Sequence, residues 1–187
     1  MILLISMRLK QLFLELLETF LSSVVILLVI YMFVALPEMV WGSSMEPNFH
    51  TGERVLVEKI TRIFKPAFER GEVVIIKPEG STRHIIKRVI GIPGDIIKVY
   101  NCKVFISRDN SKYVLEEPYL AQNTCTKGGT QVLDGKALKL GNNEYVLLGD
   151  NRGVSLDSRI LGPIKSDRIV GRVVFRWWPP AKVGFVR

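Results

Sequence analysis

The sequence predicts a mainly β protein that is preceded by one N-terminal transmembrane helix. Residues 20–36 contain no charged side chain, and a helix of that length would reach about 26 Å, near the lower limit for crossing a bilayer. After this segment, short apolar runs alternate with turns that contain Gly, Pro or Asn, which is typical of β-strands. No long amphipathic helix stands out after residue 60, and residues 60–68 are expected to form a helical turn or loop.

The apolar segment is predicted to be a retained anchor. If it is extended back to Leu12, it takes in Glu15 and Glu18, which would lie at the membrane interface, where acids cost less than at the bilayer centre. A cleaved secretory signal is the alternative. Against it, the apolar run is longer than the usual ~7–15 residues. The candidate cleavage site at residues 33–35 also begins with a large Phe, where a small residue belongs.

Charged residues before the segment predict its orientation. Arg8 and Lys10 precede it, and basic residues favour the cytoplasmic side of a membrane. We therefore expect residues 1–41 to form the cytoplasmic N-terminus and the anchor. Residues 42–187 would then form one β-rich domain on the extracytoplasmic face, which is within the usual size of a single domain.

The charge balance favours an anionic partner. The chain has a formal net charge of +8, and residues 42–187 hold 24 basic and 15 acidic side chains. Such a surplus suits lipid headgroups or nucleic acid. Because the same chain has a membrane segment, we expect membrane lipid. We expect no nucleic acid, since no basic motif is interleaved with aromatic residues. The sequence predicts no particular oligomeric state.

The β elements follow in order along the chain. A Gly-Ile-Pro-Gly-Asp turn at 91–95 closes one strand, and Asn101-Cys102 separates two runs that form a predicted hairpin. Residues 101–142 are polar and weakly patterned, so we expect an inserted β extension between core strands. The predicted strands are 54–58, 73–76, 84–90, 96–100, 103–106, 145–148 and 173–175.

The two cysteines lie in the part expected outside. Cys102 and Cys125 could form a disulfide in an oxidising compartment, and two unpaired thiols are the alternative. A zinc site is not expected, because there is no Cys-x-x-Cys, and His50 and His84 are distant from either cysteine in sequence. We expect no metal ion and no cofactor.

A serine and a lysine are the candidates for chemistry. Ser44 follows the apolar segment closely, and a serine hydroxyl needs a base to become nucleophilic. Lys87 shares a strand face with Ile85 and Val89, and loss of hydration there would lower the pKa of its amine by the roughly 3 units that a base requires. The alternative for Lys87-Arg88 is an ordinary basic pair on a strand edge.

A histidine base is a second alternative. Both His50 and His84 could in principle serve Ser44, although neither lies in a recognisable motif. The dense polar segment 150–159 follows an apolar strand. It is either a solvated turn or a set of hydroxyl, carboxylate and guanidinium groups that supports the base.

Three segments in order resemble the conserved boxes of type I signal peptidases. They are Ser44-Met45-x-Pro47, Lys87-Arg88-Val89-x-Gly91-x-Pro93-Gly94-Asp95 and Gly149-Asp150-Asn151-Arg152-x-x-Ser155-x-Asp157-Ser158-Arg159. Arg70-Gly71-Glu72-Val73-Val74 and Phe175-Arg176-Trp177-Trp178-Pro179 are similar to two further boxes. The resemblance runs from about residue 12 to the end. A single box is weak evidence, whereas the ordered set beside an anchor is specific.

The resemblance implies a membrane-bound serine endopeptidase that removes signal peptides from exported preproteins. It implies a β-rich catalytic core near the plasma (inner) membrane or another energy-transducing membrane. By motif, Ser44 would be the nucleophile and Lys87 the general base. Ser155 would orient the lysine, Asp150 would pair with Arg88, and Asp157 and Arg159 would support the site. Met45, Phe49 and Ile86 would line shallow pockets for small side chains.

Some positions depart from the family pattern. Phe49 stands where the family often has Leu, which would tighten the pocket. Gly42 stands where some members carry a hydroxyl that aids the oxyanion hole, and Ser43 adjoins the expected nucleophile. Two other functions stay open. One is a self-processing Ser–Lys protease of the repressor type, and the other is an inactive membrane-tethered binding module of the same fold.

Overall fold

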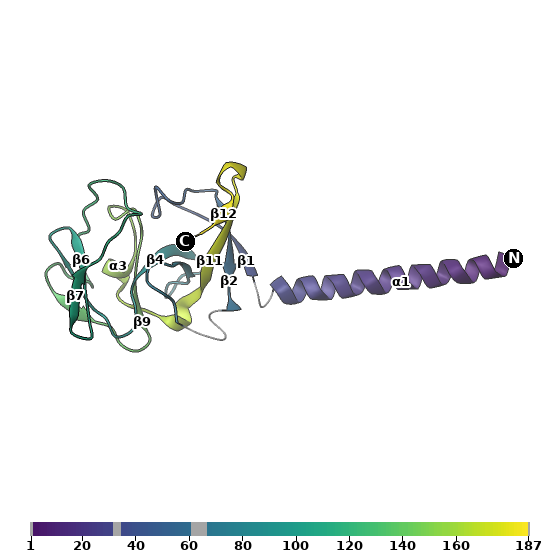
Figure 1. Ribbon diagram of the computed structural model, residues 1–187, viewed down its shortest axis with the longest axis horizontal. Helices are drawn as coiled ribbons and strands as arrows, with labels where there is room; N and C mark the ends of the chain where they lie inside the picture. The colour runs from purple at the N-terminus through teal and green to yellow at the C-terminus, as the bar shows by residue number, and fades with distance from the viewer. Residues whose placement is uncertain (1, 32–34, 61–66, 187) are drawn as a thin grey trace.

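The computed structural model describes residues 2–31, 35–60 and 67–186. A long N-terminal helix extends away from a β-rich body (Figure 1). The elements are α1 Ile2–Val29, β1 Ala35–Met39, β2 Arg54–Glu58, β3 Val73–Ile76, β4 Ile85–Gly91, β5 Ile96–Tyr100, β6 Lys103–Arg108, β7 Ser111–Val114, β8 Ala137–Lys139, β9 Glu144–Leu148, α3 Ser158–Leu161, β10 Ile164–Lys165, η2 Ser166–Arg168, β11 Ile169–Trp178, η3 Pro180–Lys182 and β12 Gly184–Phe185. The predicted mainly β fold with one N-terminal apolar helix is confirmed.

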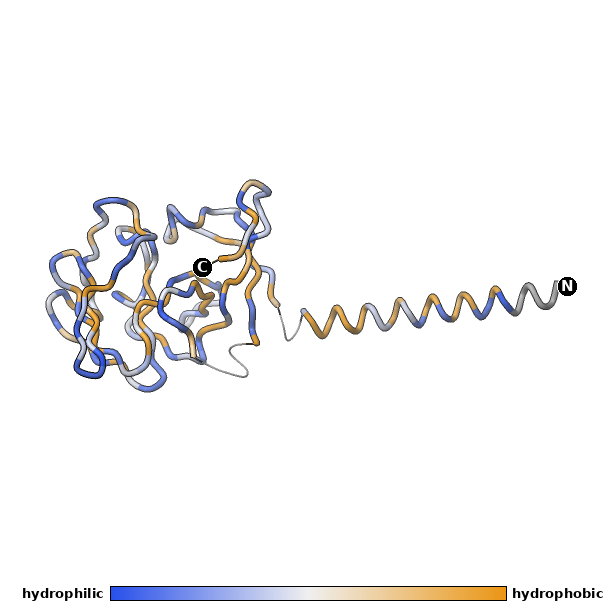
Figure 2. Tube along the Cα trace, viewed as in Figure 1, coloured by the Kyte–Doolittle hydropathy of each residue, from blue (hydrophilic) through white to orange (hydrophobic). Residues whose placement is uncertain are grey.

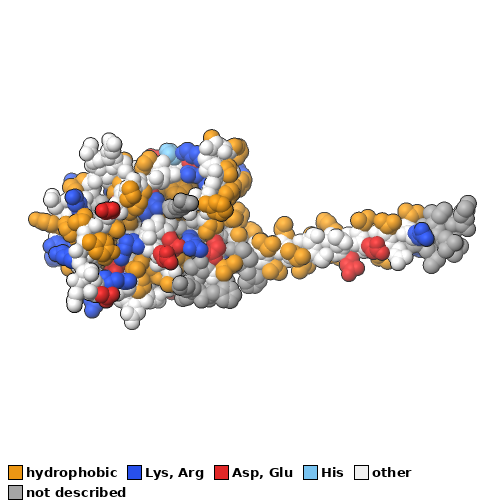
Figure 3. All heavy atoms as spheres, in the orientation of Figure 1, with side chains coloured by type: hydrophobic (Ala, Val, Ile, Leu, Met, Phe, Trp, Pro, Cys, Tyr) orange, Lys and Arg blue, Asp and Glu red, His pale blue; other side chains and the backbone are white. Residues whose placement is uncertain are grey.

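Helix α1 is long and apolar enough to cross a membrane. Its candidate span, Arg8–Val29, has 22 residues and is the one such span within the described ranges. At ~1.5 Å per residue it covers about 33 Å, close to the thickness of a bilayer core. Figure 2 shows hydrophobic residues along most of the helix, interrupted by hydrophilic ones, and Figure 3 shows its charged side chains in the part nearer the N-terminus.

Hydroxyl groups inside this helix bond to its own backbone. Thr19 Oγ1 donates to the carbonyl of Glu15 at 2.8 Å, and Ser23 Oγ donates to the carbonyl of Thr19 at 2.7 Å. Polar side chains that are satisfied within one helix are compatible with an apolar surrounding.

The C-terminal end of the apolar run differs from the prediction. The uncharged segment 20–36 was expected to be one helix, but the helix ends at Val29, and Ala35–Met39 form strand β1. Pro37 favours the extended conformation within β1, because proline disfavours the helical conformation of the preceding Leu36 and cannot donate a backbone hydrogen bond. Strand β1 then pairs with β2 in antiparallel register. The assignment of 1–41 to cytoplasm and membrane stays a prediction.

The main sheet contains eight strands. Its order is β1-β2-β11-β3-β4-β9-β10, and β12 pairs with β11. Strand β3 is buried along its whole length, as its continuous apolar sequence predicts. In the pairing of β3 with β4, Val74 lies opposite Lys87 and Val73 opposite Arg88. The sheet thus places Lys87 and Arg88 in its interior rather than on an edge.

A second sheet has the order β7-β6-β5-β8 and covers residues 96–139. The predicted hairpin is confirmed. Asn101 and Cys102 form its two-residue turn with φ of 49° and 62°, a turn geometry that suits tight hairpins. Cys102 also forms a disulfide with Cys125, with their Cα atoms 4.4 Å apart, so the alternative of unpaired thiols is wrong. The sheet begins at Ile96, slightly before the predicted insertion.

Three apolar clusters form the core. The first contains Met45, Phe49 and Ile86, and lies beside the segment that carries Ser44. The second packs the smaller sheet against β9, and the third contains Val89 and Tyr145. Most of the segment 60–68, expected to be a helical turn or loop, lies outside the described residues.

Candidate active site

Ser44 and Lys87 meet although 43 residues separate them. Lys87 Nζ lies 2.7 Å from Ser44 Oγ and donates to the carbonyl of Ile86 at 2.8 Å. Ser44 sits in a turn between β1 and β2, and the buried side chain of Met45 holds that turn against the core. Lys87 comes from the interior strand β4 and is 2% exposed. A hydroxyl and an amine are therefore in direct contact.

Burial controls the charge of the lysine. Loss of hydration lowers the pKa of Lys87 to about 8, and the nearby Asp157 and Asp150 partly oppose this shift. Ile85 and Val89, which share its strand face, pack with the third cluster. A neutral amine is thus accessible near physiological pH, which is the state that a general base needs.

Arg88 and Asp150 form a buried two-point ion pair. Arg88 Nε and Nη2 donate to the two carboxylate oxygens at 2.9 and 2.7 Å. Arg88 Nη1 also donates to the carbonyl of Gly71, and Asn48 Nδ2 donates to Asp150 at 2.7 Å. The Tyr119 ring lies 4.1 Å from the guanidinium carbon of Arg88. The pairing that the motif implied is present, and it joins the nucleophile segment to β4.

Asp157 and Arg159 form a second buried pair. Arg159 Nε and Nη2 each donate to Asp157 at 2.8 Å, and Asp157 also caps the short helix α3. Burial alone would raise the pKa of Asp157, but Arg159 and the backbone N–H of Gly149 hold it below its ordinary value. The carboxylate therefore stays charged and orders the loop beside Lys87.

Ser155 is placed differently from its expected role. It is 6% exposed, and its Oγ makes no hydrogen bond of good geometry with any described residue, although Ser155 contributes to the low pKa of Asp157. The Lys87 amine instead contacts Ser44 and the carbonyl of Ile86. The expected hydrogen bond between Ser155 and Lys87 is thus absent from this structure.

Gly149 connects Ser155 to Ser44. A Cβ atom at this position would lie 2.2 Å from Ser155 Oγ and 2.4 Å from the carbonyl oxygen of Ser44. The same Ser44 carbonyl accepts a hydrogen bond from the backbone N–H of Asn151 at 3.0 Å. The loop 149–151 therefore packs directly on the backbone of the nucleophile, and only glycine fits at its first position.

Of the three residues expected to line the substrate pocket, two lie in the core and only Ile86 also borders a hollow. Met45 and Phe49 are core residues, with 0% and 3% exposure. Ile86 is also buried, but it lines a small hollow of about 10 Å³ together with Val40 and Trp41. Neither Ser44 nor Lys87 lines this hollow.

The histidines do not contact the serine. His84 Nδ1 lies 2.6 Å from Glu38, and His50 lies 3.2 Å from Lys182 Nζ and 3.4 Å from Glu53. These positions favour Lys87 over a histidine as the base.

The two residues before Ser44 do not contact the lysine in its place. Ser43 is exposed, and Lys87 contacts Ser44 instead. Gly42 has φ of +80°, a conformation that favours glycine, which accounts for the missing hydroxyl there.

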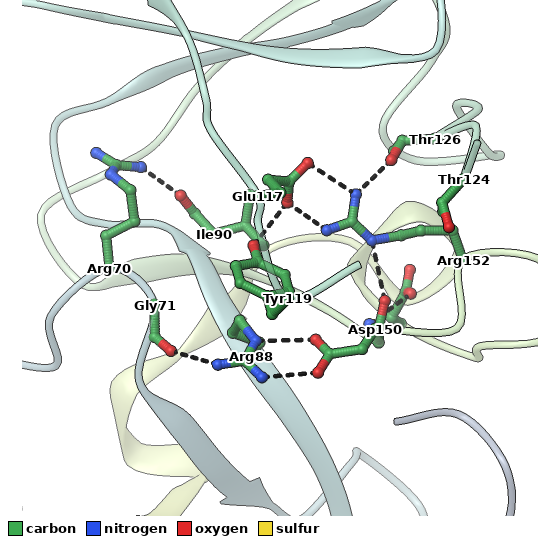
Figure 4. A network of polar contacts seen from close by, with 12 residues as sticks. Arg70, Gly71, Arg88, Ile90, Glu117, Tyr119, Thr124, Thr126, Asp150 and Arg152 are labelled. Atoms are coloured by element: carbon green, nitrogen blue, oxygen red, sulfur yellow. Dashed lines mark hydrogen bonds and ion pairs between the residues drawn. The ribbon is translucent and has the colours of Figure 1, made fainter. Parts of the chain in front are cut away.

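Sequence reasoning assigned no role to several supporting residues. Figure 4 shows Glu117 and Tyr119 reaching from the insertion toward Arg88 and Arg152. Arg152 lies within the polar segment 150–159, whose dense charged and hydroxyl side chains mark it as a candidate support for the base. Glu117 and Tyr119 lie in a weakly patterned region, where no periodicity points to them.

No metal-binding arrangement is evident in the described part of the chain. Within it, no group of three or more His, Cys, Asp or Glu side chains could hold a metal ion.

Comparisons with known proteins identify relatives over most of the chain. The family model "Signal peptidase, peptidase S26" matches residues 13–178. A probable signal peptidase I-2 from Synechocystis is 34% identical over 180 residues, covering 92% of this chain and 77% of that protein. Signal peptidase IB from Staphylococcus aureus is 37% identical over 179 residues, covering 88% and 91%. A crystal structure of a signal peptidase I from Enterococcus faecalis has a TM-score of 0.45 and 23% identity, covering 56% of this chain and 95% of that chain.

Proposed function

The chain belongs to the signal peptidase family, peptidase S26, and on that premise we propose that Ser44 and Lys87 cleave N-terminal signal peptides from exported preproteins. Family membership makes it a serine endopeptidase whose substrates are preproteins that carry signal peptides. The observation that carries the residue assignment is the 2.7 Å contact between Nζ of the buried Lys87 and Oγ of the half-buried Ser44.

Acylation would begin with proton transfer from Ser44 to neutral Lys87. Ser44 Oγ attacks the scissile carbonyl carbon, and the backbone N–H of Ser44 donates to the resulting oxyanion. Protonated Lys87 then gives its proton to the departing amine, the C–N bond breaks, and the mature protein leaves. Lys87 next takes a proton from water, whose oxygen attacks the ester carbonyl carbon. The bond from that carbon to Ser44 Oγ breaks, Lys87 returns the proton to Ser44, and the signal peptide leaves with a new carboxyl group. One amine thus serves both half-reactions.

Supporting residues would hold this pair in place. Arg88 with Asp150 fixes the strand that carries Lys87 against the nucleophile segment, through Asn48. Asp157 with Arg159 orders the 150–159 loop through the Gly149 N–H. Ser155 Oγ lies beside Gly149 and contributes to the low pKa of Asp157, so it would support the site through that carboxylate.

The substrate site would select small side chains near the cut. Ile86, whose carbonyl accepts from Lys87 Nζ, lies in one apolar cluster with Val40, Met45 and Phe49, and these bulky groups would limit the space near the cut. Selection by shape alone contributes only a few kcal/mol. Efficient cutting of a substrate with Phe directly before the scissile bond would contradict this assignment.

Members of this family are membrane-anchored, and the single apolar helix fits a protein that crosses the membrane once. We further propose that the N-terminus is cytoplasmic and that residues 42–187 face outward, with the basic domain near anionic lipid. Protease added outside spheroplasts should then digest the region after Trp41. Protection of that region, with clipping of the N-terminus instead, would reverse the orientation.

The deciding experiment is cleavage of a model preprotein by the purified full-length chain in detergent. Ser44→Ala should lower the turnover by at least ~10³-fold, since loss of an activated nucleophile removes most of the rate enhancement. Ser43→Ala is the matched control, because it removes the adjacent exposed hydroxyl, and it should keep near wild-type turnover. If Ser43→Ala is inactive and Ser44→Ala is active, the nucleophile has been misassigned.

A further inference from the structure

Two side chains of the insertion reach the loop beside the active serine. Glu117 and Tyr119 lie between β7 and β8, and no residue of this stretch belongs to the motifs described above. Their partners, Arg152 and Arg88, belong to those motifs (Figure 4). The insertion is therefore in direct contact with the site.

Glu117 holds Arg152 through both of its carboxylate oxygens. Arg152 Nη1 donates to Glu117 Oε2 at 3.2 Å, and Nη2 donates to Oε1. The pair is almost completely buried, because the Arg152 side chain is 1% exposed and the Glu117 side chain 8% exposed. The Thr126 hydroxyl accepts a further bond from Arg152 Nη1, and Thr126 adjoins the disulfide-bonded Cys125. The guanidinium is thus fixed from the side of the insertion.

Arg152 transmits this placement to the nucleophile. Its Nε donates to the carbonyl of Gly149 at 3.0 Å. Gly149 is in contact with the carbonyl of Ser44 and with Ser155, as the distances from its Cβ position show. A shift of Arg152 would therefore move the peptide on which Ser44 rests.

Tyr119 links the two buried arginines. Its hydroxyl donates to Glu117 Oε1 at 2.7 Å, while its ring lies against the Arg88 guanidinium. The backbone carbonyl of Tyr119 accepts from Asn48 Nδ2, which also donates to Asp150. Burial and the charge of Glu117 raise the pKa of Tyr119, so the phenol stays protonated and keeps its donor.

We propose that Glu117 is a positioning residue for the Ser44–Lys87 pair. It acts through Arg152 and Gly149, with Tyr119 orienting its carboxylate. This inference rests on the proposed function, because it assigns to the insertion the task of holding the catalytic serine at the correct distance from its base. A contact that only stabilises the fold would leave the turnover of the folded enzyme unchanged.

The test is steady-state cleavage of a model preprotein by full-length Glu117→Gln in detergent. Misplacement by about 1 Å can cost ~10²-fold in rate, so we expect kcat to fall by about 10- to 100-fold with KM within about threefold of wild type. Glu116→Gln is the matched control, because Glu116 is the exposed neighbour, and it should match wild type in both constants. Wild-type kcat for folded Glu117→Gln overturns the proposal.

A double-mutant cycle tests the path through Arg152. If Glu117 acts only by holding Arg152, then Glu117→Gln combined with Arg152→Gln should lower kcat no further than Arg152→Gln alone. Additive losses would contradict that path. Should Glu117→Gln fail to fold, Tyr119→Phe removes only the hydroxyl and keeps the ring. It should still lower kcat by about threefold or more, and an unchanged kcat would reject the inference.

Ser44→Ala separates this inference from the proposed function. If Ser44→Ala is inactive while folded Glu117→Gln is fully active, only the positioning role is lost. If Ser44→Ala is active, the catalytic assignment itself fails.

Discussion

Lys87 Nζ lies 2.7 Å from Ser44 Oγ, and the lysine side chain is 2% exposed. The two facts belong together, because the burial that brings the amine to the hydroxyl also removes the water that would keep it charged. The nucleophile and the basicity of its partner thus arise from one packing arrangement.

The pH dependence of cleavage should follow the charge of Lys87. Its pKa is lowered to about 8 by burial, so the neutral, active form dominates above that pH and is lost below it. We expect kcat/KM for a model preprotein to fall about tenfold for each pH unit below ~7.5 and to level off above ~8.5. If kcat/KM instead falls to half its maximum near pH 6.5, the group that must lose its proton is a histidine.

Replacement of Lys87 by arginine should abolish activity although the positive charge is kept. A guanidinium stays protonated at any accessible pH and cannot accept the Ser44 proton. Lys103→Arg, at an exposed position of β6, is the control and should be fully active. His50→Ala and His84→Ala should retain turnover. An inactive histidine variant beside an active Lys87→Arg would mean that the base is a histidine.

Gly149→Ala should inactivate the enzyme. The added Cβ would lie 2.2 Å from Ser155 Oγ and 2.4 Å from the Ser44 carbonyl, so the loop and the nucleophile must move apart. Gly184→Ala is the comparison, because a Cβ there meets no atom within 4 Å. Initial rates on a model preprotein should fall by about 10²-fold for the first variant and stay near wild type for the second. Equal rates would show that the contact with Ser44 is unimportant.

Asp150→Asn should destabilise the fold strongly. It leaves the buried Arg88 guanidinium without its counter-charge, and breaking a buried pair typically costs about 3–5 kcal/mol. Glu79→Gln removes one partner of the exposed pair with Arg168 and should cost less than about 1 kcal/mol. Denaturant unfolding of the full chain in detergent measures both. Similar free energies of unfolding for the two variants would argue that the Arg88 pair is solvated.

The Cys102–Cys125 disulfide should contribute to stability. It spans a sequence separation of 23 residues, for which the chain-entropy model gives about 3 kcal/mol. The double variant Cys102→Ser/Cys125→Ser should unfold at lower denaturant concentration by a corresponding amount. Thiol labelling of the denatured, unreduced wild type should find no free cysteine, whereas two labelled thiols per chain would mean that the bridge does not form.

Local patterns determined the elements that the sequence predicted well. The hairpin around Asn101 and Cys102 was found because a two-residue turn limits which residues fit. The buried strand β3 was found because a continuous apolar run suits a strand covered on both faces. The apolar anchor was recognised from composition, and the types of residue needed for a Ser–Lys site were visible at Ser44 and Lys87.

Only the tertiary structure decided how distant segments meet. Glu117 and Arg152 are 35 residues apart, and no periodicity links them. Met45 and Phe49 became core residues and Ser155 lacked its expected bond, because the packing of the nucleophile turn and the 150–159 loop sets those positions. Residue types and short-range patterns determine chemistry and local conformation. The distance between a nucleophile and its base depends on contacts across the sheet, which arise only when the whole chain is packed.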